Sequence, residues 1–376
     1  MIHRLLEKIV RKQLFKGLAV VIYGARQVGK TTLVKSILSE FGNEGIYFNC
    51  DQPDIASALS NKTSLELYGY LQGRKLVVLD EAQRVENIGI TIKLLVDTYP
   101  EMQIIATGSS SFDLANKISE PLTGRAWFHT LFPLSYAELY LEDSMAASRS
   151  LNRIIRLGTF PRIWQANEDV AIQHLNGLTS SFLFKDLLLF EQLRKAPLLS
   201  RLLQALALQL GNEVSYSELA TILNVDAKTI NRYIYLLEQA FVIFRLPSLK
   251  RNPRGEISKL RKVYFCDLGV RNSFIQNFNE LDLRTDTGAL WENFCILERM
   301  KNMAYHQKFA NYYFWRSYDK QEIDLIEERG GMMSAFEFKW RKPYKNLSMP
   351  PGFYRLYPKS DFAVIHKENF EQFVIQ

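Results

Sequence analysis

Residues 18–38 read LAVVIYGARQVGKTTLVKSIL. Gly24 to Thr31 match the pattern GxxxxGK[ST], between an apolar run typical of a buried strand and a run typical of a helix. Glycines allow the loop backbone to turn its N–H groups onto phosphate oxygens, and the start of the helix adds the positive end of its dipole. The stretch therefore predicts a strand, a phosphate-binding loop and a helix in succession.

The loop predicts specific contacts to a bound nucleotide. We expect Lys30 to reach the β- and γ-phosphates and the Thr31 hydroxyl to bind Mg²⁺. The cofactors that the loop predicts are therefore ATP or ADP together with Mg²⁺. The other residues expected to contact the nucleotide belong to the loop or to the first turn of the helix: Gly24, Arg26, Gln27, Val28, Gly29 and Thr32.

A second apolar run, residues 76–80, ends in two adjacent carboxylates, Asp80 and Glu81. A carboxylate at the end of a buried strand is suited to hold the shell of a phosphate-bound Mg²⁺, and we assign this role to Asp80. Glu81 is then expected to act as the general base that polarises the attacking water. A strand ending in two acids is a common pattern, but downstream of a phosphate-binding loop it indicates nucleotide hydrolysis.

A third apolar run, residues 103–108, is followed by the polar cluster Ser109, Ser110 and Ser111. In an open sheet of parallel strands, ligands bind outside the carboxyl ends of the strands, so this cluster is expected at the same crevice. One of its hydroxyls is a candidate for orienting the hydrolytic water. The alternative is a simple turn that ends the strand.

The composition limits the class of protein. The chain has 376 residues, a net charge of +7 and 47% hydrophobic residues, a globular composition that excludes wholesale disorder. Its three cysteines and five histidines lack the spacing of a disulfide framework or a zinc site. No segment has 18 uninterrupted apolar residues, so we expect a reduced, cytoplasmic protein without a membrane-spanning helix. The basic, amphipathic N-terminus is interpreted as a docking helix, in preference to a membrane-surface helix.

Residues 214–246 have the spacing of a helix-turn-helix. Asp226 is expected to cap a second helix with one apolar face, and Lys228 and Arg232 fall on another face. With the strands FVIFRL and KVYFC, the segment resembles a winged helix. The loop between those strands carries a basic cluster opposed by one acid, Glu256: Lys250, Arg251, Arg254, Lys259, Arg261 and Lys262.

Two interpretations of this segment remain open. The basic residues of the second helix and the wing are suited to contact phosphates of DNA, mainly through Lys228, Arg232, Lys250, Arg251 and Arg254. The alternative is that the segment serves as a lid or as a module that docks other proteins. A solvated basic loop would have the same composition.

The C-terminal part contains a second group of candidate site residues. Glu337 and Lys339 are two apart in an expected strand and so share a face, and Asp324 lies on a preceding strand that can pair with it as a hairpin. With Glu292 on an upstream helix, these residues predict a divalent-metal site for phosphodiester chemistry. The pattern resembles the PD-(D/E)XK nuclease core. The alternative is a structural ion-pair cluster in which Lys339 neutralises the acids.

Several motifs together resemble one family. These are GARQVGKTT, YFNCDQPD, LVVLDEAQR, IIATGSSS and LTGRAWFHTLFPLSYAEL. The set is similar to the archaeal and bacterial AAA+ ATPases that are fused to an uncharacterised C-terminal domain, near the branch that contains the STAND regulatory ATPases. The resemblance implies an α/β fold with a P-loop AAA+ parallel sheet, then a helical lid and winged helix, then a small α/β restriction-endonuclease-like domain.

The resemblance also implies roles for individual residues. Asp80 and Glu81 correspond to the Walker B pair, and Ser109 or Ser110 to sensor 1. Arg125 in LTGR corresponds to an arginine that acts as a sensor in its own subunit or as an arginine finger in a neighbour, within a homo-oligomer. The expected domains are the ATPase domain at 1–135, the helical lid at 136–210, the winged helix at 211–265 and the nuclease-like domain at 266–376.

Three functions are compatible with these features. The first is an ATP-hydrolysing machine or switch that acts on DNA through the winged helix. The second is a nucleotide-gated regulator that docks a protein, with an inert terminal domain. The third is an ATP-coupled, Mg²⁺-dependent nuclease.

Overall fold

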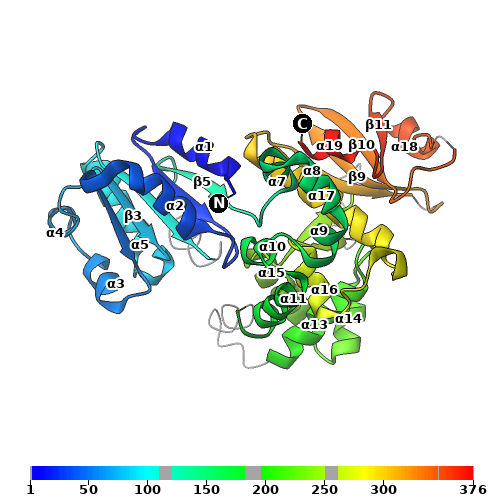
Figure 1. Cartoon of the computed structure of the whole chain (residues 1–376), viewed down its shortest axis with the longest axis horizontal. Coiled ribbons are helices and arrows are strands. Elements are labelled where there is room, and N and C mark those ends of the chain that lie inside the picture. The colour runs from blue at the N-terminus through cyan, green and yellow to red at the C-terminus, as the bar shows by residue number, and fades with distance from the viewer. Residues whose placement is uncertain are drawn as a thin grey trace. The chain divides into compact units, whose positions relative to one another are not determined.

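The computed structural model of the chain describes residues 2–109, 121–182, 196–249, 261–317, 319–345 and 347–375. Its contacts divide the chain into two compact units, each of which is described by itself (Figure 1). The first unit comprises Met1–Leu134 with Gln239–Phe241, and the second comprises Ser135–Glu238 with Val242–Gln376.

A five-stranded parallel sheet forms the core of the first unit (Figure 1). Its strands are β1 (Ala19–Tyr23), β2 (Gly45–Asn49), β3 (Leu76–Asp80), β4 (Gln103–Gly108) and β5 (Ala126–Thr130). Their order across the sheet is β2-β3-β4-β1-β5, and every neighbouring pair is parallel. Strands β1 to β4 are formed by four apolar runs of the sequence, LAVVIYG, GIYFNC, KLVVLDE and QIIATGS. The sequence did not reveal β5, because this edge strand leaves Trp127 and Phe128 exposed and has no continuous apolar run.

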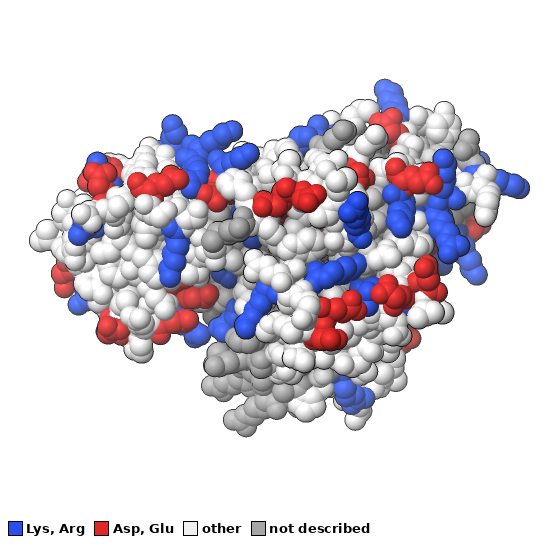
Figure 2. Space-filling model, in the orientation of Figure 1, with Lys and Arg blue, Asp and Glu red and all other residues white. Residues whose placement is uncertain are grey.

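Helices cover the sheet of the first unit and connect its strands. The N-terminal helix buries Leu6 and Val10, as a docking helix does, and Figure 2 shows Lys and Arg side chains gathered over it. None of the helices in the described part of the chain is both long and apolar enough to cross a membrane. The helices are α1 (Leu5–Gln13), α2 (Lys30–Leu38), α3 (Pro53–Leu59), α4 (Ser64–Tyr70) and α5 (Ile88–Thr98), with 3₁₀ turns η1 (Ser39–Glu44) and η2 (Ala82–Arg84).

The second unit begins with helices. They are α7 (Tyr136–Glu142), α8 (Ser144–Arg149), α9 (Leu151–Leu157), α10 (Pro161–Gln165), α11 (Glu168–Gly177), the π-turn η3 (Leu178–Phe182), α13 (Ala196–Leu208), α14 (Tyr216–Leu223) and α15 (Ala227–Gln239). The last two are consecutive helices in the segment for which a helix-turn-helix is expected. Asp226 caps α15 by accepting a 2.8 Å hydrogen bond from the Thr229 N–H, and Ile230 and Ile234 are buried.

Two sheets follow in the second unit. An antiparallel pair is formed by β6 (Ile243–Pro247) and β7 (Arg261–Phe265). The terminal sheet has the order β11-β10-β9-β8, with β8, β9 and β10 antiparallel and β11 parallel to β10. Its elements are α16 (Leu268–Phe274), η4 (Leu281–Leu283), α17 (Thr287–Tyr305), β8 (Asn311–Arg316), β9 (Glu322–Arg329), β10 (Met332–Phe338), α18 (Pro351–Leu356), β11 (Asp361–Ile365) and α19 (Phe370–Ile375).

A buried ion network ties the antiparallel pair to the terminal sheet. Lys262 on β7 is 2% exposed, and its Nζ lies 2.9 Å from Glu292 Oε1 on α17 and 2.7 Å from Glu322 Oε1 on β9. The Tyr264 hydroxyl donates a 2.5 Å hydrogen bond to the same Glu292 oxygen. Burial lowers the pKa of Lys262, but the acids Glu292, Asp324 and Glu322 outweigh it, so the pKa is raised and the lysine stays charged.

Burial and the nearby Asp324 raise the pKa of Glu292 to about 7, against the opposing effect of Lys262 and Tyr264. The unfolded value is about 4.3, so the folded chain binds more protons between these two pH values. We therefore expect the contribution of this group to the free energy of unfolding to fall as the pH rises from about 4.3 to 7. In urea unfolding, the stability of the native chain relative to Glu292→Gln should decrease over this window by roughly 1–3 kcal/mol. The exposed Glu142→Gln is the control, and stability curves of the native chain and Glu292→Gln that run parallel across this range contradict the assignment.

Candidate nucleotide site

The phosphate-binding loop connects β1 to α2 and requires glycine at both ends. At Gly24, a Cβ atom would collide with the backbone carbonyl oxygen of Leu131. Gly29 has a φ of 100° and immediately precedes the first turn of α2, a conformation that side chains other than hydrogen disfavour. The loop backbone can therefore adopt the shape that turns N–H groups toward an anion.

Lys30 is folded back over this loop. Its side chain is 5% exposed, and Nζ donates to the carbonyl oxygens of Gly24 at 2.8 Å and Ala25 at 3.0 Å. A buried ammonium is costly unless its donors are satisfied, and here the loop carbonyls accept them. The ammonium group is thus held at the loop, where a phosphate would compete for it.

Asp80 lies at the carboxyl end of β3 and collects hydroxyl groups from three directions. Oδ2 accepts hydrogen bonds from Thr31 Oγ1 at 2.7 Å and from the Tyr47 hydroxyl at 2.6 Å, and Oδ1 accepts one from Thr107 Oγ1. Thr31 begins α2, Tyr47 lies on β2 and Thr107 on β4. Burial and then the hydrogen bond to Asp80 raise the pKa of Tyr47, so its hydroxyl stays a donor.

Glu81 adopts the left-handed conformation, with a φ of 54°, which turns the chain sharply after β3. Its backbone N–H donates to Thr107 Oγ1 at 3.2 Å, so one threonine contacts both acids. Gln83 Nε2 donates to Glu81 Oε2 at 2.6 Å and to Ser109 Oγ at 3.2 Å. Gln83 therefore orients the Glu81 carboxylate and connects it to the serine at the end of β4.

These residues fit a nucleotide with Mg²⁺. The Thr31 and Asp80 oxygens are 2.7 Å apart, close to the roughly 3 Å that separates adjacent oxygens in an octahedral shell with 2.1 Å bonds. The Thr31 hydroxyl and the carboxylates of Asp80 and Glu81 thus lie beside a loop that holds the buried ammonium group of Lys30. The structure brings together Gly24, Gly29, Lys30, Thr31, Asp80, Glu81 and Ser109. The loop also contains Arg26, Gln27 and the buried Val28, and Thr32 is exposed on α2. Ser110 lies outside the described residues.

Arg125 is not brought to the loop of its own chain. β5 is parallel to β1, with Ala19 opposite Ala126 and Tyr23 opposite Thr130. Arg125 precedes β5, so it lies at the opposite edge of the sheet from the loop, roughly 20 Å away at 3.3 Å per residue. Its Nε donates to Asp97 Oδ1 at 2.7 Å, and this exposed ion pair raises its pKa. This position favours the other expected role, contact with the nucleotide of a neighbouring copy, which stays a prediction.

Sequence reasoning missed four residues of this site: Tyr47, Thr107, Gln83 and Arg4. Tyr47 and Thr107 lie inside apolar strands, where a single hydroxyl is easily taken as part of the strand. Gln83 was part of a recognised motif but was given no role. Arg4, which directly precedes α1 and lies upstream of every motif, donates to the Val28 carbonyl oxygen at 2.7 Å.

The residues expected to contact DNA differ in their exposure to solvent. Lys228 and Arg232 are exposed on α15, on the face opposite its buried residues. Arg261 and Lys262 are not part of a solvated wing. Arg261 lies over the Tyr216 ring at 5.1 Å, and Lys262 is buried among acids. Lys250, Arg251, Arg254, Lys259 and Glu256 lie outside the described residues.

The C-terminal candidates do lie within electrostatic reach of one another. Burial raises the pKa values of Glu292, Asp324 and Glu337. The nearby Asp324 raises those of Glu292 and Glu337 further. Lys339 Nζ donates to Glu337 Oε1 at 2.7 Å, and Asp324 Oδ2 accepts from the Phe338 N–H at 2.8 Å. Within the described ranges, no group of three or more His, Cys, Asp or Glu side chains has the arrangement of a metal site.

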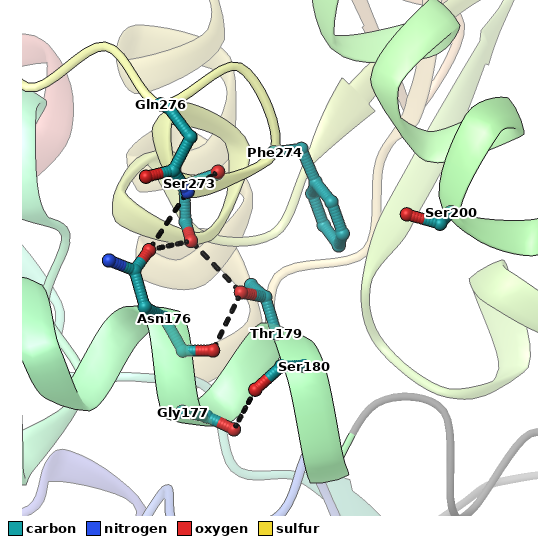
Figure 3. Close-up of a pocket in the computed structure, with 8 residues that line it drawn as sticks. All are labelled: Asn176, Gly177, Thr179, Ser180, Ser200, Ser273, Phe274 and Gln276. Atoms are coloured by element: carbon teal, nitrogen blue, oxygen red, sulfur yellow. Dashed lines mark hydrogen bonds between the residues drawn. The ribbon is translucent and has the colours of Figure 1, made fainter. Parts of the chain in front are cut away.

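Two cavities of the second unit lie apart from the residues above. One, of about 560 Å³, is lined by uncharged residues from η3, α13 and α16 and their surroundings (Figure 3). Its polar groups bond to one another: Ser273 Oγ donates to Asn176 Oδ1 at 2.9 Å, and Gln276 Nε2 donates to the same oxygen at 3.0 Å. The other, of about 300 Å³, is lined by Asn152, Asp282, Trp340, Arg341, Lys342, Lys367 and Glu368.

Comparison with known proteins agrees with the geometry of the first unit. Residues 16–140 match a family described as AAA domain, and residues 148–281 and 287–376 match two domains of unknown function, DUF8612 and DUF4143. Among solved structures, Aeropyrum pernix Orc1 in complex with DNA aligns over 74% of this chain and 93% of its own, with 14% identity and a TM-score of 0.33, too low to support a functional argument.

Curated relatives align over most of the chain. A Haemophilus influenzae protein is 24% identical over 82% of this chain and 79% of its own length. The Mycobacterium tuberculosis protein Rv2008c is 30% identical over 336 residues, which are 88% of this chain and 72% of that protein. The chain therefore belongs to the same protein family as Rv2008c, and its residues 16–140 form an AAA domain.

Proposed function

We propose that the chain is an ATPase that binds ATP with Mg²⁺ at the loop of residues 24–31 and hydrolyses it. The observation that carries this proposal is the contact of Thr31 with Asp80 at 2.7 Å, directly beside Glu81. It joins the phosphate-binding loop to the two acids that the sequence assigns to hydrolysis. The AAA domain match over residues 16–140 supports the same conclusion.

Each residue of the site has its own role in binding or hydrolysis. Lys30 exchanges the carbonyl oxygens of Gly24 and Ala25 for phosphate oxygens of ATP. Glu81 accepts a proton from water as the water oxygen bonds to the γ-phosphorus and the bond to the bridging oxygen breaks, giving ADP and phosphate. Gln83 and Ser109 hold the Glu81 carboxylate and the water in place. Mg²⁺, when bound, would be held by Thr31 and Asp80 and would neutralise charge on the phosphates.

Replacing the general base separates binding from hydrolysis. In Glu81→Gln, we expect ATP binding to persist, because the amide keeps the size of the side chain. The hydrolysis rate should fall by roughly 10²-fold or more, because the proton acceptor is lost. Phosphate release and fluorescent-nucleotide titration measure the two quantities. Glu86→Gln, an exposed acid nearby, is the control, and native turnover in Glu81→Gln would assign the base to another residue.

A second variant tests the loop itself. Lys30→Ala removes the buried ammonium and should abolish nucleotide binding or turnover. Lys62→Ala, an exposed lysine of the same unit, should leave both unchanged. Unchanged ATPase activity in Lys30→Ala would contradict the site.

The proposal extends to the arrangement of domains and copies. The ATPase domain occupies residues 1–135, followed by a helical lid at 136–210, a winged helix at 211–265 and a nuclease-like domain at 266–376. Arg125 then acts on the nucleotide of a neighbouring copy in a homo-oligomer, since its own loop is at the opposite edge of the sheet.

DNA is the partner that we propose for α15. The exposed Lys228 and Arg232 on its outer face support this proposal. If each contacts one phosphate, Lys228→Ala with Arg232→Ala should flatten the slope of log affinity against log salt by about two units. Fluorescence anisotropy with labelled duplex DNA measures this slope, with Lys62→Ala as the control. No affinity at low salt would favour docking of a protein instead.

A second candidate function is an ATP-coupled nuclease in the terminal domain. Beyond the effect of burial, Asp324 on β9 raises the pKa values of Glu292 on α17 and of Glu337 on β10, and this proximity of the acids favours it. The lysines Lys262 and Lys339 that contact these acids favour the structural ion-pair alternative.

A cleavage assay distinguishes these alternatives. If the domain is a nuclease, Mg²⁺ or Mn²⁺ should support cleavage of duplex or branched DNA by the native chain. Glu337→Ala should abolish it, and Glu328→Gln on the same sheet should not. No cleavage by the native chain would leave the ion-pair cluster as the role of these acids.

A further inference from the structure

Arg4 forms a bridge beside the phosphate-binding loop. Its side chain is buried at 7% exposure, just before α1 begins. Nη1 donates to the backbone carbonyl oxygen of Val28 at 2.7 Å, and Nη2 donates to that of Phe132 at 2.6 Å. One planar guanidinium group thus holds two carbonyls that are far apart in the sequence.

The two carbonyls belong to segments with different roles. Val28 lies inside the loop, between Gln27 and Gly29. Phe132 lies two residues after β5, on the stretch that ends the first unit at Leu134. In Figure 1 the N-terminus is drawn beside the trace that leaves β5, in agreement with the bond between Arg4 and Phe132. We call residues 131–134 the connector, because the second unit begins at Ser135.

The connector also touches the loop without Arg4. The Leu131 N–H donates to the Tyr23 carbonyl oxygen at 2.7 Å, at the last residue of β1. The Leu131 carbonyl oxygen lies where a side chain at Gly24 would be. The first and the fifth residues of the loop, Gly24 and Val28, are therefore both in contact with the connector or with the arginine that holds it.

The helix that follows Arg4 is anchored to the helix that follows the loop. Glu7 on α1 is buried, and its Oε1 accepts a hydrogen bond from Ser36 Oγ on α2 at 3.3 Å. Arg11 bonds both to Glu7 and to Glu40, which follows α2. Arg4 thus directly precedes a helix whose side chains are bonded to the helix that follows the loop.

We propose that Arg4 is a positioning residue that couples the nucleotide state of the loop to the connector. This inference rests on the proposed function and adds a form of regulation to the same site. When phosphates draw Lys30 away from the Gly24 and Ala25 carbonyls, the loop carbonyls reorient. The Val28 carbonyl either breaks a charge-assisted hydrogen bond or displaces Arg4 and, through it, Phe132. The connector therefore differs between the free and the nucleotide-bound states.

Hydrogen exchange of the connector tests this coupling in the full chain. Peptides that cover residues 129–140 should exchange at a different rate with saturating Mg²⁺ and a non-hydrolysable ATP analogue than without nucleotide. Arg4→Met keeps the length of the side chain and removes both hydrogen bonds. At saturating nucleotide, this variant should lose the change in the connector, and its affinity should fall roughly tenfold or more. Arg74→Met, which also removes an arginine bonded to a backbone carbonyl, should keep the native response.

The outcomes separate failure of the inference from failure of the proposed function. If the native chain binds no nucleotide in a fluorescence titration, the proposed function fails and the coupling fails with it. If the native chain binds nucleotide but exchange of the connector does not change, only the coupling is overturned, whether or not Arg4→Met folds. A native response in folded, nucleotide-saturated Arg4→Met would likewise overturn the role of Arg4. Thermal unfolding of the variant establishes that it is folded.

Discussion

The organisation of the first unit depends on one buried carboxylate, that of Asp80. It accepts hydrogen bonds from Thr31, Tyr47 and Thr107, which come from the start of α2, from β2 and from β4. Asp80 itself ends β3, so a single side chain joins three neighbouring strands to the helix after the phosphate-binding loop. Because the partners are hydroxyls, they satisfy the carboxylate without cancelling its charge. The same interaction that holds the strand ends together therefore preserves a negative charge beside the loop.

The sequence was informative where a chemical requirement is local. The loop needs glycine, lysine and threonine at set spacing, and the buried strands need continuous apolar runs, so Gly24, Lys30, Thr31 and β1 to β4 could all be predicted. Residues that act across strands leave no such pattern. Tyr47 and Thr107 reach Asp80 only because β2 and β4 flank β3, a consequence of strand order rather than of spacing. Arg4 was out of reach for the same reason, since its partners Val28 and Phe132 lie 24 and 128 residues further along the chain.

The charged residues were harder to interpret than the apolar pattern, because the sequence does not show whether a basic side chain is exposed or buried. Lys262 was counted with the basic wing, but it is buried and contacts Glu292 and Glu322. Arg125 was assigned to catalysis from a motif, but the parallel pairing of β5 with β1 directs it to the other edge of the sheet. In both cases the motif was recognised and the three-dimensional position decided the role. Lys228 and Arg232 are the contrasting case, because the 3.6-residue period of α15 was sufficient to predict their exposure.

The charges around Asp80 and those around Glu292 and Glu337 differ in how they are balanced, and this difference bears on which group is a binding site. In the second unit, Glu292 forms an ion pair with Lys262 and Glu337 forms one with Lys339, so each of these two acids already has a cationic partner. A metal ion at Glu292 would have to compete with the ammonium group of the buried Lys262, and loss of that ion pair is unfavourable. Around Asp80 the partners are neutral, and an arriving cation would exchange hydroxyl contacts for a charge of opposite sign. Buried charge with neutral partners is poised for a ligand, whereas buried charge with ionic partners is already complete, and on this ground the AAA domain is the better candidate for the chemistry of the chain.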